Sequence, residues 1–448
     1  MAGGSAIVGS IPTISRNNYL GGEMTERFNL FEGNCLEVMA TMAENSIDSI
    51  VTDPPYELGF MGKSWDSSGV AFNIEVWQEA LRVLKPGGHL LAFSGSRTYH
   101  RMAVAIEDAG FEIRDQIMWI YGSGFPKSHN IAKAIQKADG VEPIGFKENE
   151  NAAFYGTGSG GQYNLTPRQL FMPPTEGTAA EWDGWGTALK PAHEPIVVAR
   201  KPLIGTVANN VLTFGTGGLN IDGARVGSDE MTEGRATPSG SGAYNWNLEK
   251  GDAPKLENPA THTGRWPANV IHDGSDEVVE LFPDTKSGAV KPYVRNKESV
   301  NVDFLQGTEQ VEKSFDYADS GSAARFFYCA KASKKDRNEG LDGFEAKQIN
   351  VRKGDENAVF TPNNVSAKNH HPTVKPTSLM QYLVRLVTPP NGIVLDPFLG
   401  SGSTGKAAMY EGFNFIGIEL TPEYLPIAKA RIEFALQNKE LELDFGTP

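Results

Sequence analysis

The sequence has few cysteines and no long apolar run. Cys35 and Cys329 are the only cysteines among 448 residues, too few for a disulfide framework or a cysteine-rich zinc site. No run of about 18 consecutive apolar residues occurs, so we expect no membrane-spanning helix. The first 22 residues are rich in glycine and serine and lack the basic-then-apolar pattern of a secretory signal. These features predict a protein of a reducing cytoplasm.

The chain also lacks positive charge. Its 41 lysines and arginines are outnumbered by 55 acidic residues, which gives a net charge of −14 at pH 7. This balance argues against a protein that coats nucleic acid non-specifically, because such binding depends on many phosphate contacts. It leaves room for an enzyme with one local basic groove. The length is plausible for two domains, and an apolar content of 40% is enough for a core.

Apolar and amphipathic segments alternate through the first 121 residues. Strands are predicted at 28–34, 47–51, 89–93 and 111–121, and helices at 35–42, 73–84 and 98–109. Alternation at this spacing predicts βαβ units, and hence an α/β fold with a mainly parallel, Rossmann-like doubly wound sheet. The pattern then breaks, and the polar, glycine-rich residues 139–181 are predicted to form an insertion.

The strand predicted at 47–51 ends in Asp53-Pro54-Pro55-Tyr56. The prolines fix φ and remove backbone donors, so the strand must stop there. The Asp53 carboxylate and the Pro54 carbonyl are both hydrogen-bond acceptors, and they stand beside a flat ring. This combination suits gripping an exocyclic amino group while the ring stacks on its base. The alternative is a strand-ending turn with a surface tyrosine.

A second strand–turn–helix pattern lies far downstream. A buried strand is predicted to end at Asp396, where Gly400 and Gly402 allow a tight turn into a helix. The next strand ends in Glu419, and an acid about twenty residues beyond such a turn suits a ribose diol. Nicotinamide and flavin enzymes share a glycine turn, but the form Asp-Pro-Phe-x-Gly-Ser-Gly is more specific.

Together the two motifs resemble the amino methyltransferases of DNA, which transfer a methyl group from S-adenosylmethionine to adenine N6 or cytosine N4. The tetrapeptide comes first, a recognition-like insertion next and the cofactor turn last, an order similar to the circularly permuted β class and its phage-type members. The resemblance covers roughly residues 25–125, 185–202 and 365–436. It implies the methyltransferase fold, with both motifs meeting at neighbouring strand ends.

The resemblance implies roles for residues of both motifs. Catalysis would involve Asp53, Pro54, Pro55 and Tyr56. The cofactor would contact Asp53, Thr373, Lys375, Asp396, Pro397, Phe398, Gly400, Ser401, Gly402, Thr404 and Glu419. Thr373 and Lys375 would approach its methionine end, whose carboxylate suits a lysine; alternatively, Pro372 and Pro376 simply frame a turn. No metal site is expected.

The resemblance also implies how the chain is divided. Residues 1–23 would be a flexible arm, 24–204 the catalytic half including the insertion 139–181, 205–345 an inserted target-recognition region, and 346–448 the cofactor-binding half. Candidate DNA contacts in the recognition region are Arg225, Arg265 and Trp266 for bases, and Lys334 and Lys335 for phosphates. In the alternative interpretation the arginines are salt-bridge partners, Trp266 is core and the lysines form a solvated face.

The implied function is site-specific methylation of adenine N6 in double-stranded DNA, by base flipping and direct displacement. Aspartate at the first motif position leans towards adenine in the family. Cytosine N4 is the alternative, followed by an RNA or protein-amide methyltransferase and a non-catalytic DNA-binding module. Neither cysteine has the Pro-Cys setting of cytosine C5 chemistry. A bacterial or phage-infected cytoplasm and a restriction-modification setting are implied, and monomer and homodimer both stay open.

Overall fold

The computed structural model describes residues 27–58, 64–124, 128–142, 144–147, 168–170, 172–174, 176–232, 261–286, 320–330, 334–348 and 366–444. Side chains at 145–147, 168–170, 228–232, 261–262, 334–335, 348, 366–367 and 440–444 are outside this description. The arm predicted at 1–23 and much of the insertion predicted at 139–181 also lie outside the described residues.

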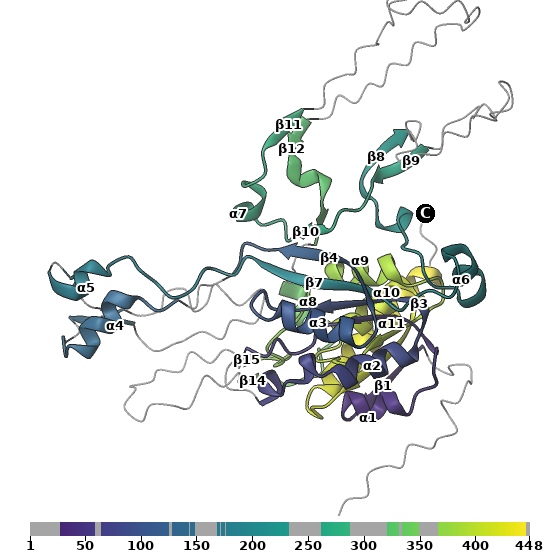
Figure 1. Ribbon diagram of the computed structural model, residues 1–448, viewed down its shortest axis with the longest axis horizontal. Coiled ribbons are helices and arrows are strands. Elements are labelled where there is room, and N and C mark those ends of the chain that lie inside the picture. The colour runs from purple at the N-terminus through teal and green to yellow at the C-terminus, as the bar shows by residue number, and fades with distance from the viewer. Residues whose placement is uncertain are drawn as a thin grey trace, which may run out of the picture.

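One central sheet organises the described part of the chain (Figure 1), with the strand order β1-β17-β16-β2-β3-β7-β4-β10-β13. The strands are β1 Phe28–Glu32, β17 Asn414–Glu419, β16 Ile393–Asp396, β2 Ile47–Thr52, β3 Leu84–Phe93, β7 His193–Arg200, β4 Glu112–Ile120, β10 Val270–His272 and β13 Tyr328–Cys329. Strand β7 runs antiparallel to both of its neighbours, and every other adjacent pair is parallel. The α/β fold with a mainly parallel sheet is therefore confirmed.

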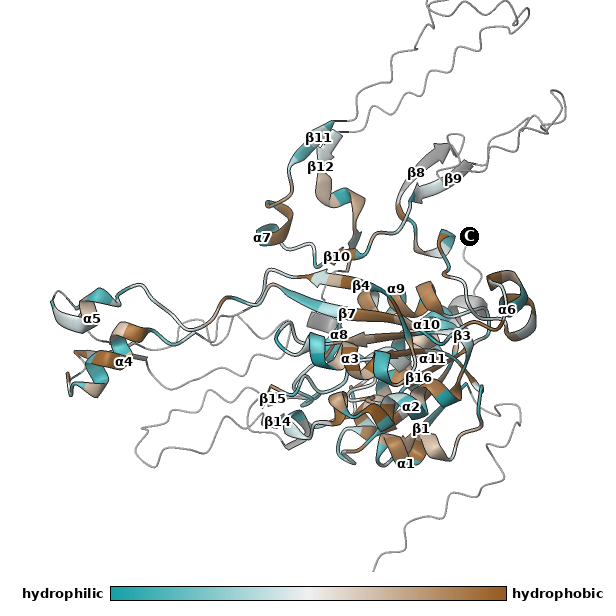
Figure 2. Cartoon of the chain, in the orientation of Figure 1, coloured by the Kyte–Doolittle hydropathy of each residue, from teal (hydrophilic) through white to brown (hydrophobic). Residues whose placement is uncertain are grey.

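Helices cover both faces of this sheet. The helices are α1 Cys35–Ala40, α2 Ile74–Val83 and α3 Tyr99–Asp108 on one face, and α9 Thr377–Val387, α10 Ser403–Glu411 and α11 Leu425–Asp444 on the other. Successive residues of β2 show why two cores form, since Ile50 packs with the first set and Val51 with the second. In Figure 2 the apolar residues gather in the sheet and on the helices beside it.

Strand β3 begins earlier than the sequence predicts. Leu84, directly after α2, pairs with Ile47, and regular pairing resumes after a shift at His89 opposite Ser49. The intervening Lys85-Pro86-Gly87-Gly88, which lies between the predicted helix and strand, is thus an irregular part of β3. Gly87 has a φ of +77°, which glycine adopts at little cost.

The segment predicted as a recognition region also contributes to the central sheet. Strand β10 pairs in parallel with β4 and with β13, although the sequence indicates no sustained βα alternation there. Beyond the sheet lie α6 Val207–Phe214, β8 Val226–Thr232, β9 Thr261–Arg265, α7 Asp276–Val279, β11 Asp284–Lys286, β12 Ser320–Ser322 and α8 Lys334–Asn338. The hairpins β8–β9 and β11–β12 extend away from the sheet in Figure 1. The central sheet continues past residue 205, and the division of the chain at that residue stays a prediction.

A smaller group of elements lies between β4 and β7 in the sequence. It contains α4 Ile131–Ala138, β5 Gly145–Lys147, β6 Arg168–Leu170 and α5 Gly177–Glu181. Helices α4 and α5 pack together at a distance from the sheet (Figure 1). Two further short strands, β14 Lys347–Gln348 and β15 Ser366–Ala367, pair antiparallel with each other.

No described helix combines the length and apolar character needed to cross a bilayer. No group of three or more histidine, cysteine, aspartate or glutamate side chains in these ranges is arranged to hold a metal ion.

The glycines at the two ends of α10 provide a stability test. Gly402 and Gly412 have φ of +78° and +82°, but a Cβ on Gly402 would lie 2.9 Å from the Ala428 Cα, whereas one on Gly412 would meet no described atom within 4 Å. We expect Gly412→Ala to lower the free energy of unfolding by about 1–2 kcal/mol through backbone strain alone. Gly402→Ala should cost about 1–3 kcal/mol more because it also crowds α11. Urea unfolding of both variants measures this difference, and equal losses would contradict the close packing.

Candidate active site

The ends of two neighbouring parallel strands bring the two sequence motifs together. Strands β2 and β16 pair with Leu395 opposite Ile50. At their ends the Thr52 hydroxyl donates a hydrogen bond of 2.6 Å to Asp396 Oδ1, across 344 positions of sequence. Asp53 follows Thr52 directly, so the acid of the tetrapeptide lies beside the start of the glycine turn. The expectation that the motifs meet at adjacent strand ends is confirmed.

Asp53 has one paired and one unpaired carboxylate oxygen. Its Oδ2 accepts a hydrogen bond of 2.7 Å from Lys375 Nζ. Its Oδ1 is buried and has no hydrogen-bond partner among the described residues. Because an unsatisfied buried acceptor costs about 1–3 kcal/mol, such an oxygen is expected where a ligand will supply the donor.

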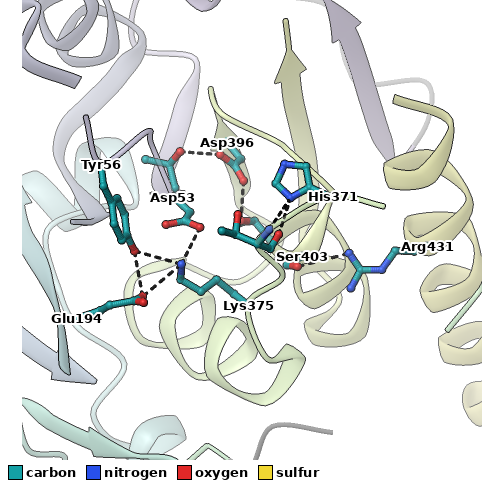
Figure 3. Close-up of polar contacts among 11 residues, drawn as sticks. Asp53, Tyr56, Glu194, His371, Lys375, Asp396, Ser403 and Arg431 are labelled. Carbon is teal, nitrogen blue, oxygen red and sulfur yellow. Dashed lines mark hydrogen bonds and ion pairs between the residues drawn. The ribbon is translucent and has the colours of Figure 1, made fainter. Parts of the chain in front are cut away.

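The Lys375 ammonium stands at the centre of a polar cluster (Figure 3). Besides Asp53, it donates to the Tyr56 hydroxyl at 3.1 Å and lies 3.3 Å from Glu194 Oε2. The Tyr56 hydroxyl in turn donates to Glu194 Oε2 at 2.9 Å. The structure joins Lys375 to the tetrapeptide, and its expected contact with the methionine end of a cofactor stays a prediction.

The protonation states in this cluster follow from its charges. Burial by itself lowers the pKa of Lys375, but the carboxylates of Asp53 and Glu194 outweigh it, so the pKa lies above its ordinary value. Burial, followed by the same two carboxylates, raises the pKa of Tyr56 well above its ordinary value. The lysine is therefore charged at neutral pH, and the tyrosine is a neutral donor.

The Tyr56 ring is held from the side of α3. The Thr98 hydroxyl, in the residue before this helix, donates a hydrogen bond of 2.8 Å to the Tyr56 carbonyl. Gly95 lies so close that a Cβ there would be 3.3 Å from Tyr56 Cδ2. Together with the hydroxyl contacts, these neighbours fix both ends of the ring.

Asp396 joins the two motifs through hydrogen bonds. Besides Thr52, it accepts hydrogen bonds from the Thr404 hydroxyl at 2.6 Å and the Phe398 N–H at 3.1 Å. Burial raises its pKa to about 6, and these three hydrogen bonds oppose that rise. Asp396 thus holds the ends of β2 and β16 and the start of α10, and its predicted contact with the cofactor stays a prediction.

The glycine turn is fixed by a second acid. The Glu419 carboxylate, at the end of β17, accepts hydrogen bonds from Gly400 N at 2.7 Å and Thr421 N at 2.8 Å. The His371 ring lies over Gly400, whose φ is +54°, and a Cβ there would be 3.0 Å from His371 Nε2. The buried Arg431 of α11 donates to the Ser401 hydroxyl at 3.0 Å and so holds the turn from behind.

Comparison with known proteins identifies the family. The model of the N6_N4_Mtase family, described as DNA methylase, matches residues 47–430. The chain belongs to this DNA methylase family. The match includes both strand ends and the glycine turn, and it carries the expected S-adenosylmethionine dependence with it.

Similar individual proteins match shorter segments. The DNA adenine methyltransferase YhdJ of Escherichia coli is 40% identical over 74 residues, 16% of this chain and 25% of that protein. The type II methyltransferase M.HinfI of Haemophilus influenzae is 43% identical over 77 residues, 17% of this chain and 21% of that protein. The chain matches between 21% and 38% of the lengths of the curated relatives. The solved cytosine-N4-specific PvuII DNA methyltransferase is 14% identical with a TM-score of 0.40, covering 94% of both chains.

The cofactor-side residues of this DNA methylase fit S-adenosylmethionine. Glu419 offers carboxylate oxygens at a strand end, where a ribose diol needs acceptors. Gly400 and Gly402 give the turn its two positive φ angles, and the partly buried Phe398 ring comes just before it. Thr373 lies in the segment that crosses Gly400, held by backbone contacts with the His371 ring. Binding roles for these residues, Pro397 and Thr404 included, stay predictions.

The residues predicted to contact DNA have different surroundings. Arg225 pairs with Asp222 at 2.8 Å, as in the salt-bridge alternative, and its guanidinium lies 5.6 Å from the Trp266 ring. Trp266 is 64% exposed, so the core alternative is wrong for this residue. Arg265 stacks on Phe326 at 4.8 Å. Lys334 and Lys335 begin α8, but their side chains lie outside the described part of the chain.

Glu194 is the site residue that the sequence did not single out. It lies at the start of β7, and its contacts come from residues far away in sequence. The one local signal is an acid directly before a proline at a strand terminus, which Glu194-Pro195 shares with Asp53-Pro54. Lys406 pairs with Glu339 at 2.6 Å, and no local sequence pattern pointed to this ion pair.

Thr404 tests the role of Asp396. Thr404→Val leaves Asp396 Oδ2 buried without its donor, so we expect the free energy of unfolding to fall by about 1–3 kcal/mol. Thr404→Ser keeps the hydroxyl and removes one methyl group, which should cost at most about 0.8 kcal/mol. Chemical denaturation of both variants measures the contrast. A valine variant as stable as the serine variant would show that this hydrogen bond does not hold the strand ends.

Proposed function

We propose that this DNA methylase transfers a methyl group from S-adenosylmethionine to adenine N6 in double-stranded DNA. The observation that supports this most directly is the unpaired, buried Oδ1 of Asp53, a residue that lies between Tyr56 and Asp396 in Figure 3. An exocyclic amino group has the N–H donors that this oxygen lacks. Family membership supports DNA as the substrate.

The proposed mechanism begins with a base turned out of the duplex, at a cost of about a few kcal/mol. Tyr56 stacks on the base, which contributes roughly 1–3 kcal/mol. Asp53 Oδ1 and the Pro54 carbonyl accept the two hydrogen bonds of the amino group. These bonds turn the nitrogen lone pair towards the cofactor side of the pocket, and catalysis follows largely from this positioning.

Bound S-adenosylmethionine supplies an electrophilic methyl group on a positively charged sulfur. With it bound, the amino nitrogen held by Asp53 and Pro54 would take the methyl group directly, and the electron pair of the carbon–sulfur bond would stay with sulfur. The nitrogen then releases one proton, for which Asp53 Oδ1 is an acceptor already in contact. Glu419, Phe398 and the glycine turn hold the donor, and Asp396 keeps the two halves of the pocket aligned.

The choice between two bases rests on the tetrapeptide. Its first residue, Asp53, leans towards adenine in the resemblance, and one similar protein is named an adenine methyltransferase. Cytosine N4 is the second candidate, because an acid and a carbonyl can grip either amino group. Arg225, Arg265 and the exposed Trp266 are proposed to contact the duplex, as are Lys334 and Lys335.

Labelled methyl transfer distinguishes these functions. The protein is incubated with methyl-labelled S-adenosylmethionine and unmethylated DNA, and the nucleosides are separated after digestion. We expect label in N6-methyladenosine. Label in N4-methylcytidine would identify cytosine as the target base, and the absence of label from both nucleosides would contradict DNA methylation.

The Asp53 carboxylate is tested by Asp53→Asn. The amide removes the negative charge next to the nitrogen that becomes positive, so we expect kcat to fall about 100-fold with a smaller change in KM. Asp48→Asn is the matched control, because Asp48 lies in the same strand and pairs with Lys85 at 2.6 Å, away from the cluster. That variant should lose stability but keep the turnover of the folded enzyme. An Asp53→Asn variant with most of the wild-type turnover would show that this acid has another role.

A further inference from the structure

Glu194 reaches the active site because of the direction of its strand. The ends of the parallel strands β2 and β16 lie at one edge of the sheet, and β7 runs the opposite way between β3 and β4. The start of β7 therefore lies at the edge where its neighbours end. Glu194, the second residue of β7, is 7% exposed and faces Tyr56 and Lys375. Figure 3 shows it on the opposite side of the ammonium from Asp53.

Glu194 supplies one of the oxygen atoms around the Lys375 ammonium. An ammonium has three N–H donors, and here three oxygens surround it, on Asp53, Tyr56 and Glu194. Because Tyr56 and Glu194 supply two of the three, Asp53 needs to contribute only one carboxylate oxygen. Its Oδ1 is the atom that stays without a partner.

Glu194 also changes the charge of the cluster. One buried carboxylate is enough to neutralise Lys375, and each further buried ion carries a desolvation cost of several kcal/mol. With Asp53 and Glu194 both present, two carboxylates surround one ammonium and leave a net negative charge. An excess buried charge of this kind is unfavourable for stability and is typical of functional sites.

We propose that Glu194 is a positioning residue for methyl transfer: it holds Lys375 and the Tyr56 hydroxyl, keeps Asp53 Oδ1 free for the target amino group, and leaves the cluster negatively charged. This inference rests on the proposed function, in which the amino nitrogen becomes positive as it forms its bond to carbon. The net negative charge then stabilises the transition state more than the bound substrate, so its effect falls on kcat. Without Glu194, Lys375 would cancel the charge of Asp53.

The test compares kcat and KM of the full chain and its Glu194→Gln variant, with labelled S-adenosylmethionine and unmethylated DNA. Glutamine keeps an oxygen for the Tyr56 hydroxyl but removes the charge, so we expect kcat to fall about tenfold while both KM values stay within about twofold. Glu112→Gln is the matched control, because Glu112 pairs with Arg200 at the opposite end of β7, at 2.6 Å. Its turnover should equal that of the wild type.

A second comparison separates charge from shape. Lys375→Met leaves two carboxylates facing each other, whereas the double variant Lys375→Met with Glu194→Gln returns the cluster to the single charge of Asp53. In Lys375→Met the two carboxylates repel each other across the place of the lost ammonium, which moves Asp53 out of position. The double variant has the net charge of the wild type without this repulsion, so we expect it to be at least about threefold more active than Lys375→Met alone. This comparison does not require Glu194→Gln to fold on its own.

The outcomes distinguish the two proposals. Wild-type transfer to DNA with unchanged turnover in Glu194→Gln would overturn the role of Glu194 and leave the proposed function intact. A loss confined to KM, or a double variant less active than Lys375→Met, would also overturn it. A wild-type protein that labels no DNA base would contradict the proposed function and, with it, this role of Glu194.

Discussion

The structure depends on the hydrogen bonds that converge on the Asp396 carboxylate. The hydroxyls of Thr52 and Thr404 and the Phe398 N–H donate to this one group, which is 2% exposed. They join the end of β2, the end of β16 and the first turn of α10. Because the carboxyl ends of parallel strands share one edge, a single buried acid can align an acceptor from the first third of the chain with a glycine turn from the last.

Buried cations hold the other side of the glycine turn. Arg431 and Lys406 are both fully buried, and Lys406 forms ion pairs with Asp336 and Glu339 at 3.5 and 2.6 Å. The Arg337 backbone and side chain bond with the segment that contains Asn369 and His371, and that segment lies over the turn. Arg337, two residues after the predicted phosphate contacts Lys334 and Lys335, is thus an internal support. The residues just before the cofactor half thus help to hold the segment that lies over the glycine turn.

Local pattern predicted the elements of the fold well, because strand ends, glycine turns and amphipathic helices are set by neighbouring residues. Helix α3 spans Tyr99–Asp108 where the sequence predicts 98–109, and the two strands predicted to end next to acids, β2 and β16, pair with each other. Local pattern could not predict what depends on distant partners. The role of Glu194 requires the reversed direction of β7, and the place of β10 in the sheet rests on three residues opposite Met118 to Ile120. Trp266 is apolar and was weighed as core, yet no described element covers it.

The pairing of β4 with β7 has a consequence for how such enzymes diversify. Ile120 at the end of β4 lies opposite His193 at the start of β7, so the chain between them leaves the sheet and returns to it at one place. The entropy of closing a loop grows only slowly with its length, and this loop begins and ends next to Glu194. Descendants of this gene could therefore lengthen, shorten or exchange the segment that holds α4 and α5 at little cost in folding. Such changes would alter what surrounds the catalytic edge while the sheet and its chemistry stay the same.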